Sequence, residues 1–128
     1  MGFFTKLKQG AALQDWARSK GANLKGAQLI NQFALAGYNQ CPQCRDFKAY
    51  VEAVKFEVEW SLGTYLYDLS DDWDREENEY AWQNIEEWQL NTAINNVNMA
   101  YLVGGPVKDK YKMTVKEYVK FIENQQNG

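Results

Sequence analysis

The most informative pattern in the chain is a helical segment, about residues 45–67, whose apolar side chains recur on two opposite faces. At about 100° per residue, steps of three and four place one apolar set on a single face: Phe47, Tyr50, Val51, Val54, Val58, Leu62, Tyr65 and Leu69. The opposite face carries Ala49, Ala53, Phe56, Trp60, Gly63 and Tyr67. Because an ordinary surface helix has one apolar stripe, we expect both faces of this helix to be covered.

Two polar seams separate these faces, and they contain Lys48, Glu52, Lys55 and Glu59 on one side and Asp46, Glu57 and Thr64 on the other. Two arrangements would cover both apolar faces. The helix can be the middle layer of a bundle, or a second molecule can cover the face with Phe56, Trp60 and Tyr67. Large exposed apolar patches mark interaction sites, so these three residues form the candidate oligomer face.

The remaining periodicity predicts helices over about 3–20, 23–35, 75–103 and 114–123. Gly21 ends the first of these helices, Gly104-Gly105-Pro106 ends the third, and Thr114 with Glu117 forms a capping box for the last. Residues 107–113 alternate lysines with other side chains and predict an extended connection. The expected fold is all-α: one domain over residues 1–128, a bundle of about five helices around the long helix at 45–67.

Charge divides the chain into three parts. Residues 1–40 carry five basic side chains against one acidic, a net +4, and residues 41–104 carry four against thirteen, a net −9. Residues 105–128 carry five against three, a net +2, which gives the overall −3. Phosphates would be repelled by the middle part, so we do not expect it to bind nucleic acid directly.

The sequence gives no signal for a membrane or for export. It has no apolar run of about 18 residues that could span a bilayer, and residues 1–8 lack the pattern of a signal peptide or of N-myristoylation. We therefore expect a cytoplasmic protein whose cysteines are reduced.

Cys41-Pro42-Gln43-Cys44 directly precedes the two-faced helix. A thiolate at a helix N-terminus has a lowered pKa and is more reactive. The spacing resembles the Cys-Pro-x-Cys motif of glutaredoxins, and this resemblance implies disulfide redox chemistry. It covers about ten residues, and the buried strand and cis-proline segment of that family are not evident here.

Cys41 and Cys44 also resemble the zinc hooks at the tips of repair-complex coiled coils, where each chain supplies two thiolates to a shared metal. Zinc prefers four ligands. The chain has no His and no other Cys, so this resemblance implies a zinc-bridged homodimer. The third interpretation is that the two cysteines are only structural. Apart from this possible zinc, no cofactor is expected.

Residues 68–79 place acidic or hydroxyl side chains at the ligand positions of a calcium loop. Trp73 and Arg75 stand where that loop needs Gly and an apolar residue, so a capped helix start is the alternative. The absence of His excludes Ser–His and Cys–His catalysis. No other arrangement predicts an enzyme.

The acidic, aromatic-rich stretch at 68–87 suggests a protein-binding surface instead. Its candidate residues are Asp71, Asp72, Trp73, Asp74, Glu76, Glu77, Glu79, Tyr80 and Trp82. Acidic groups speed encounter with a basic partner, and aromatic side chains anchor the complex. The resulting hypothesis is a non-enzymatic module of inhibitor, immunity or adaptor type. The alternative is a thiol-based function of Cys41 and Cys44.

Overall fold

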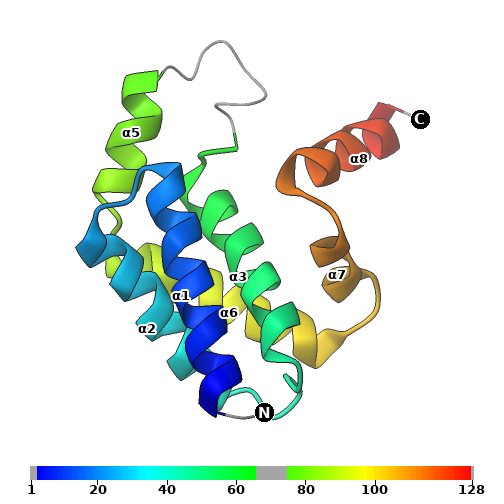
Figure 1. The fold of residues 1–128 in the computed structure, drawn as a ribbon. Coiled ribbons are helices and arrows are strands. Elements are labelled where there is room, and N and C mark those ends of the chain that lie inside the picture. Colours follow the sequence, from blue (N-terminus) through cyan, green and yellow to red (C-terminus); the bar gives the residue numbers. More distant parts are fainter. Residues whose placement is uncertain (1–2, 66–74, 128) are drawn as a thin grey trace.

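The computed structural model describes residues 3–65 and 75–127, and every regular element in these two ranges is helical (Figure 1). The elements are α1 (Phe3–Lys20), α2 (Leu24–Asn39), α3 (Phe47–Leu62), α5 (Arg75–Gln83), α6 (Glu87–Val103), α7 (Pro106–Asp109), the 3-10 helix η1 (Lys110–Lys112) and α8 (Val115–Asn127). The all-α prediction is confirmed over these residues.

Four helices enclose the main core. α1 packs against α2 and α3, and α6 packs against the same two helices, with α1 in front and α6 behind in the view of Figure 1. α5 lies at one end of this core, while α7, η1 and α8 form a C-terminal arm beside α3. A bundle of five helices around one central helix is therefore not confirmed.

α3 is shorter than the predicted helix at 45–67. Asp46 caps its start, because the Asp46 side chain accepts hydrogen bonds from the backbone N–H groups of Lys48 and Ala49. Gly63 ends it in the left-handed conformation, with φ 76°. The apolar period continues past Gly63 in the sequence, which is why the pattern alone extends the helix too far.

The predicted helix at 75–103 is two helices, α5 and α6. The Asn84 side chain donates a hydrogen bond to the Tyr80 carbonyl at the end of α5. Glu86 and Gln89 then form a capping box that starts α6. Three residues between the two helices change the direction of the chain. The spacing of apolar residues does not reveal this break, because apolar residues continue in the sequence before and after it.

Residues 107–113 are predicted as an extended connection, but residues 107–112 are helical and only Met113 is extended. Gly105 (φ 58°) precedes Pro106, which occupies the first turn of α7, where a missing N–H leaves no donor unpaired. η1 continues directly from α7, and the backbone N–H of Glu117 then donates to the Thr114 hydroxyl at the start of α8. The predicted cap at Thr114 is thus present.

Candidate functional site

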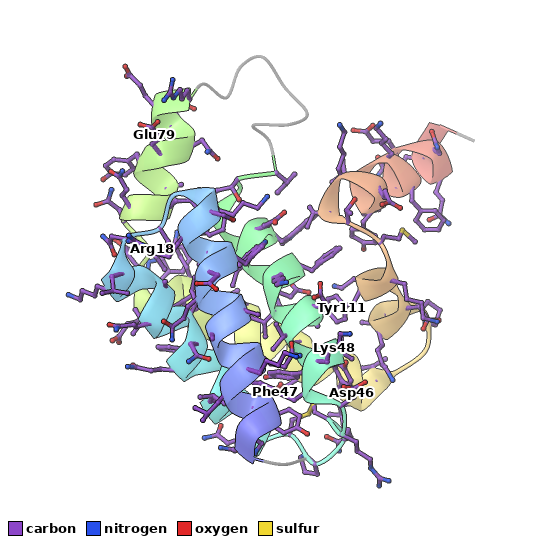
Figure 2. The ribbon with its side chains drawn as sticks, viewed as in Figure 1. Arg18, Asp46, Phe47, Lys48, Glu79 and Tyr111 are labelled. Atoms are coloured by element: carbon purple, nitrogen blue, oxygen red, sulfur yellow. A yellow bond between two sulfur atoms is a disulfide. The ribbon has the colours of Figure 1, made fainter. Side chains whose placement is uncertain are left out.

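α5 presents three acidic side chains and one tyrosine to solvent. Glu76, Glu77 and Glu79 are exposed, and Tyr80 is 70% exposed. Arg75 Nε lies 3.0 Å from Glu79 Oε1 in an ion pair on the helix surface. Figure 2 shows Glu79 near the outer end of α5. We call Glu76, Glu77, Glu79 and Tyr80 the acidic face.

The other predicted members of this surface fall into two groups. Asp71, Asp72, Trp73 and Asp74 lie outside the described residues. Trp82 is only 2% exposed, and its ring meets the Trp16 ring edge-on with a centroid separation of 5.5 Å. Its prediction as a partner-binding residue is therefore wrong, because Trp82 fixes α5 to the core. Tyr80, two residues earlier on the same helix, is exposed. Tertiary packing alone determines that Trp82 is buried and Tyr80 is not.

A groove of about 340 Å³, which sequence reasoning missed, adjoins the acidic face. It is lined by Asn23, Lys25, Gly26, Leu29, Tyr80, Gln83, Asn84, Ile85 and Glu86. Asn23 stabilises the junction from α2: its Oδ1 accepts from the Gly26 N–H at 2.8 Å, and its Nδ2 donates to the Gln83 carbonyl at 3.4 Å. Tyr80 is the aromatic residue of this lining, and the other lining residues are a mixture of polar and apolar types.

The C-terminal arm covers the second apolar face of α3. Phe56 is 5% exposed, and its ring lies 5.3 Å from that of Tyr111 and 5.5 Å from that of Tyr118. Trp60, at 38% exposed, stacks on Tyr65 at 5.0 Å. The chain itself therefore buries Phe56, which is not available as part of an oligomer face. Tyr67, the third predicted member of that face, lies outside the described residues.

A buried carboxylate joins the arm to the core. Glu57 is 2% exposed. Its Oε2 accepts from the Tyr111 hydroxyl at 2.7 Å and lies 3.2 Å from Lys110 Nζ, while its Oε1 accepts from Asn96 Nδ2 at 3.3 Å (Figure 2 labels Tyr111). Burial, and then the hydrogen bond that the Tyr111 hydroxyl donates to Glu57, raise the pKa of Tyr111 well above its ordinary value. Three donors satisfy the buried charge, so the cluster ties η1 to α3 and α6.

Sequence reasoning places Glu57 in a polar seam but does not find this cluster. Its partners Lys110 and Tyr111 belong to the segment predicted as extended, and no local spacing connects them to Glu57. Of the alternating lysines at 108, 110 and 112, only Lys110 is partly buried, and the alternation itself does not distinguish it from the other two.

Cys41 and Cys44 form a disulfide with an S–S distance of 2.07 Å, so the expectation of reduced thiols is not met. Both side chains are buried, at 5% and 6% exposed. They lie in the turn between α2 and α3. Because Asp46 caps α3, Arg45 and Asp46 separate Cys44 from Phe47, the first residue of the helix.

No group of three or more potential metal-ligating side chains (His, Cys, Asp or Glu) occurs within residues 3–65 and 75–127. Most of the calcium-loop candidate at 68–79 lies outside those ranges, so only its last residues can be placed, and they belong to α5. Over the same part of the chain, no helix combines the length and apolarity needed to cross a membrane.

No protein-family model matches the chain, and neither a curated protein nor a solved structure matches it.

Proposed function

We propose that the protein is a non-enzymatic binding module that uses the acidic face of α5 to engage a basic protein partner. The observation that carries this proposal is the combination of a 70%-exposed Tyr80 with three exposed carboxylates on one short helix. Tyrosine is one of the residue types enriched at binding hot spots, and carboxylates beside it favour a basic partner. The adjoining groove of about 340 Å³ gives a partner side chain a place to insert beside Tyr80.

The burial of Trp82 supports the same function. A short helix such as α5 is unstable alone in water, but the contact of Trp82 with Trp16 holds it on the core. A partner then meets a preorganised surface and loses less conformational entropy on binding. The carboxylates attract a basic surface and raise the association rate, while Tyr80 slows dissociation. Asp71, Asp72 and Asp74 belong to the same acidic stretch and would add to this attraction.

The thiol-based alternative has less support. Attack by an external thiolate requires access to a disulfide sulfur, and both Cys41 and Cys44 are buried. A zinc ion shared between two chains would require both cysteines to be free and exposed. The position of the disulfide instead suits a structural role in the turn that links α2 to α3.

Site-specific photo-cross-linking tests the proposed function. A benzophenone amino acid at position 80 should capture one basic protein in cells that express the chain natively. The same amino acid at position 121 is the control, because Phe121 is an exposed aromatic residue on α8. Mass spectrometry identifies the captured protein, whose affinity is then measured with purified components.

Two double charge reversals decide which surface binds. Glu76→Lys with Glu77→Lys should weaken affinity for the captured protein at least about tenfold, because it removes the attractive field of α5. Glu117→Lys with Glu123→Lys makes the same change in net charge on α8 and should alter affinity less than about twofold. Tyr80→Ala should also lose about tenfold. Equal losses from both double variants would show that only net charge matters and would contradict the proposal.

A further inference from the structure

The C-terminal arm (α7, η1 and α8) buries little of its own surface. Over residues 106–126, whose burial the structure describes, only Val115 is buried, while Tyr118, Val119 and Ile122 of α8 are half-buried. In contrast, α3 and α6 each bury a whole side in the main core. Because the burial of apolar surface is the main source of stability, the arm is held less firmly than the main core.

The junction between the arm and the main core is incompletely packed. A cavity of about 220 Å³ lies between Trp16 of α1, Phe56 of α3 and Val115 of α8. The other residues that line this cavity are Glu52, Lys55, Glu59, Tyr111, Met113 and Thr114. Protein interiors are close-packed and contain few voids larger than a water molecule. The arm therefore rests on the core as a docked surface and does not form a continuous core with it.

Two glycines connect the arm to α6. Gly104 has φ 74° and Gly105 has φ 58°, and a Cβ atom at either position would meet no atom beyond the adjacent residues within 4 Å. Close packing therefore does not require glycine here, but the left-handed backbone does. Hinges in proteins consist of a few residues at the ends of elements that absorb large changes in φ and ψ. Gly104 and Gly105 have these properties.

A cluster of polar contacts closes the arm on α3. The Glu57 carboxylate accepts a hydrogen bond from the Tyr111 hydroxyl and pairs with Lys110. Breaking a buried ion pair is costly when one charge stays buried without its partner. An arm that opens instead brings both charged groups into water, and their hydration offsets much of the lost attraction. This contact can therefore close the arm reversibly.

We propose that the C-terminal arm is a hinged cover, which opens as one unit about Gly104 and Gly105 while the main core of α1, α2, α3 and α6 stays folded. Figure 1 shows the arm beside α3, where the chain arrives from the end of α6. The closed arm hides Phe56 and Glu57, and the open arm exposes this aromatic ring and carboxylate together. The arm thus blocks part of α3. This inference is independent of the proposed function, because the acidic face lies on α5.

Alkylation of introduced cysteines by iodoacetamide tests whether the arm opens independently. Val115→Cys places a thiol under the closed arm, and Val97→Cys is the matched control, because it makes the same substitution at a buried position of α6. The native cysteines do not compete, since their sulfurs are joined in the disulfide. Position 115 should react at least about 100-fold faster than position 97. Its rate should also depend less on urea, because arm opening exposes less surface than global unfolding.

Substitutions in η1 test whether the arm opens as one unit. Lys110→Met leaves Glu57 without its cation only in the closed form, so it should raise the alkylation rate at position 115 at least about tenfold. Lys112→Met is the control, because the Lys112 side chain is 82% exposed and pairs with Asp109 on the surface. This control should change the rate less than about twofold. Position 97 should still react more slowly than position 115 in the Lys110→Met background, which shows that the core stays folded.

Three results would overturn the proposal. Equal rates at positions 115 and 97, with the same urea dependence, would show that the arm opens only when the whole molecule unfolds. A thiol at position 115 that reacts as fast as one in an unfolded peptide would show that the arm does not close. If Lys110→Met had no more effect than Lys112→Met, α8 would move without η1, and the hinge would not lie at Gly104 and Gly105.

Discussion

Gly37 illustrates how single positions determine the packing of this molecule. A Cβ atom on Gly37 would lie 2.4 Å from Ile94 Cγ2 and 2.6 Å from the Tyr50 hydroxyl oxygen. That hydroxyl donates to Asn98 Oδ1 at 2.7 Å, and Asn98 Nδ2 donates to the Gly37 carbonyl at 3.1 Å. The missing side chain lets α2 approach α3 and α6 closely enough to close this hydrogen-bonded chain.

Gly37→Ala should therefore lower the free energy of unfolding by about 2 kcal/mol, because overpacking outweighs the better helix propensity of alanine. Urea denaturation measures the change. Gln32→Ala on the exposed side of α2 is the matched control and should change stability by less than about 0.5 kcal/mol. A Gly37→Ala variant as stable as the wild type would show that Ile94 and Tyr50 move aside freely.

At the scale of the element, the C-terminal arm depends on one buried ion pair. Lys110 has 20% of its side chain exposed and pairs with Glu57. Its ammonium also lies 5.8 Å from the centroid of the Phe56 ring and 5.8 Å from that of Tyr118. Lys110 thus contacts both the charge and the aromatic rings that hold η1 and α8 on α3.

Lys110→Met should lower the free energy of unfolding by about 2–4 kcal/mol, because it leaves the Glu57 carboxylate buried without a cation. Glu57→Gln should cost a similar amount. The double variant should lose clearly less than the sum of the two single losses, since neither charge is then left unpaired. Glu79→Gln, in an exposed ion pair on α5, is the control and should change stability by about 0.5 kcal/mol or less. Additive losses at Glu57 and Lys110 would contradict the coupling.

The elements also show what the sequence can and cannot predict. The two apolar faces of α3 are visible from spacing alone. The first face is buried over the described residues of α3, and the second is buried at Ala53 and Phe56 but leaves Trp60 38% exposed. What covers the second face is not visible, because Phe56 meets Tyr111 and Tyr118 more than fifty residues away. The ends of α3 and the break between α5 and α6 depend on Gly63 and Glu86, whose backbone geometry an apolar period does not encode.

Among the candidate site residues, Glu76, Glu77, Glu79 and Tyr80 are exposed as the binding hypothesis requires, and Trp82 is not. The difference arises from the position of Trp16 on α1, which is set by the tertiary fold. The groove beside Tyr80 likewise forms only where the start of α2 meets the turn between α5 and α6. Local sequence determines the character of these side chains, and long-range packing determines which of them meet solvent.

For the whole molecule, buried tyrosines set the response to alkaline pH. Burial raises the pKa of Tyr50, of Tyr101 and of Tyr111 above the ordinary value of 10.0. Below pH 10 these hydroxyls are protonated in both the folded and the unfolded chain, so they give no pH dependence. Above pH 10 the unfolded chain loses protons that the folded chain retains, so stability falls as pH rises.

Tyr50 and Tyr111, whose pKa values rise furthest, should each lower the free energy of unfolding by up to about 1.4 kcal/mol per pH unit above about pH 10, and Tyr101 should contribute less. Urea denaturation at several pH values between about 8 and about 11.5 measures the total slope. Tyr111→Phe should make the slope shallower by one such contribution, although it is less stable at pH 8 because Glu57 loses a donor. Tyr80→Phe, at an exposed ring, is the matched control. A slope unaffected by Tyr111→Phe would contradict the assignment.

The edge-on contact between Trp16 and Trp82 has a practical consequence. The hidden side of α5 carries an indole whose fluorescence depends on how that helix rests on α1, while the outward side carries the groups expected to meet a partner. Any complex that shifts or clamps α5 would alter the emission of this indole pair. Tryptophan fluorescence can therefore report partner binding at α5, and titrations can be followed without attaching a dye.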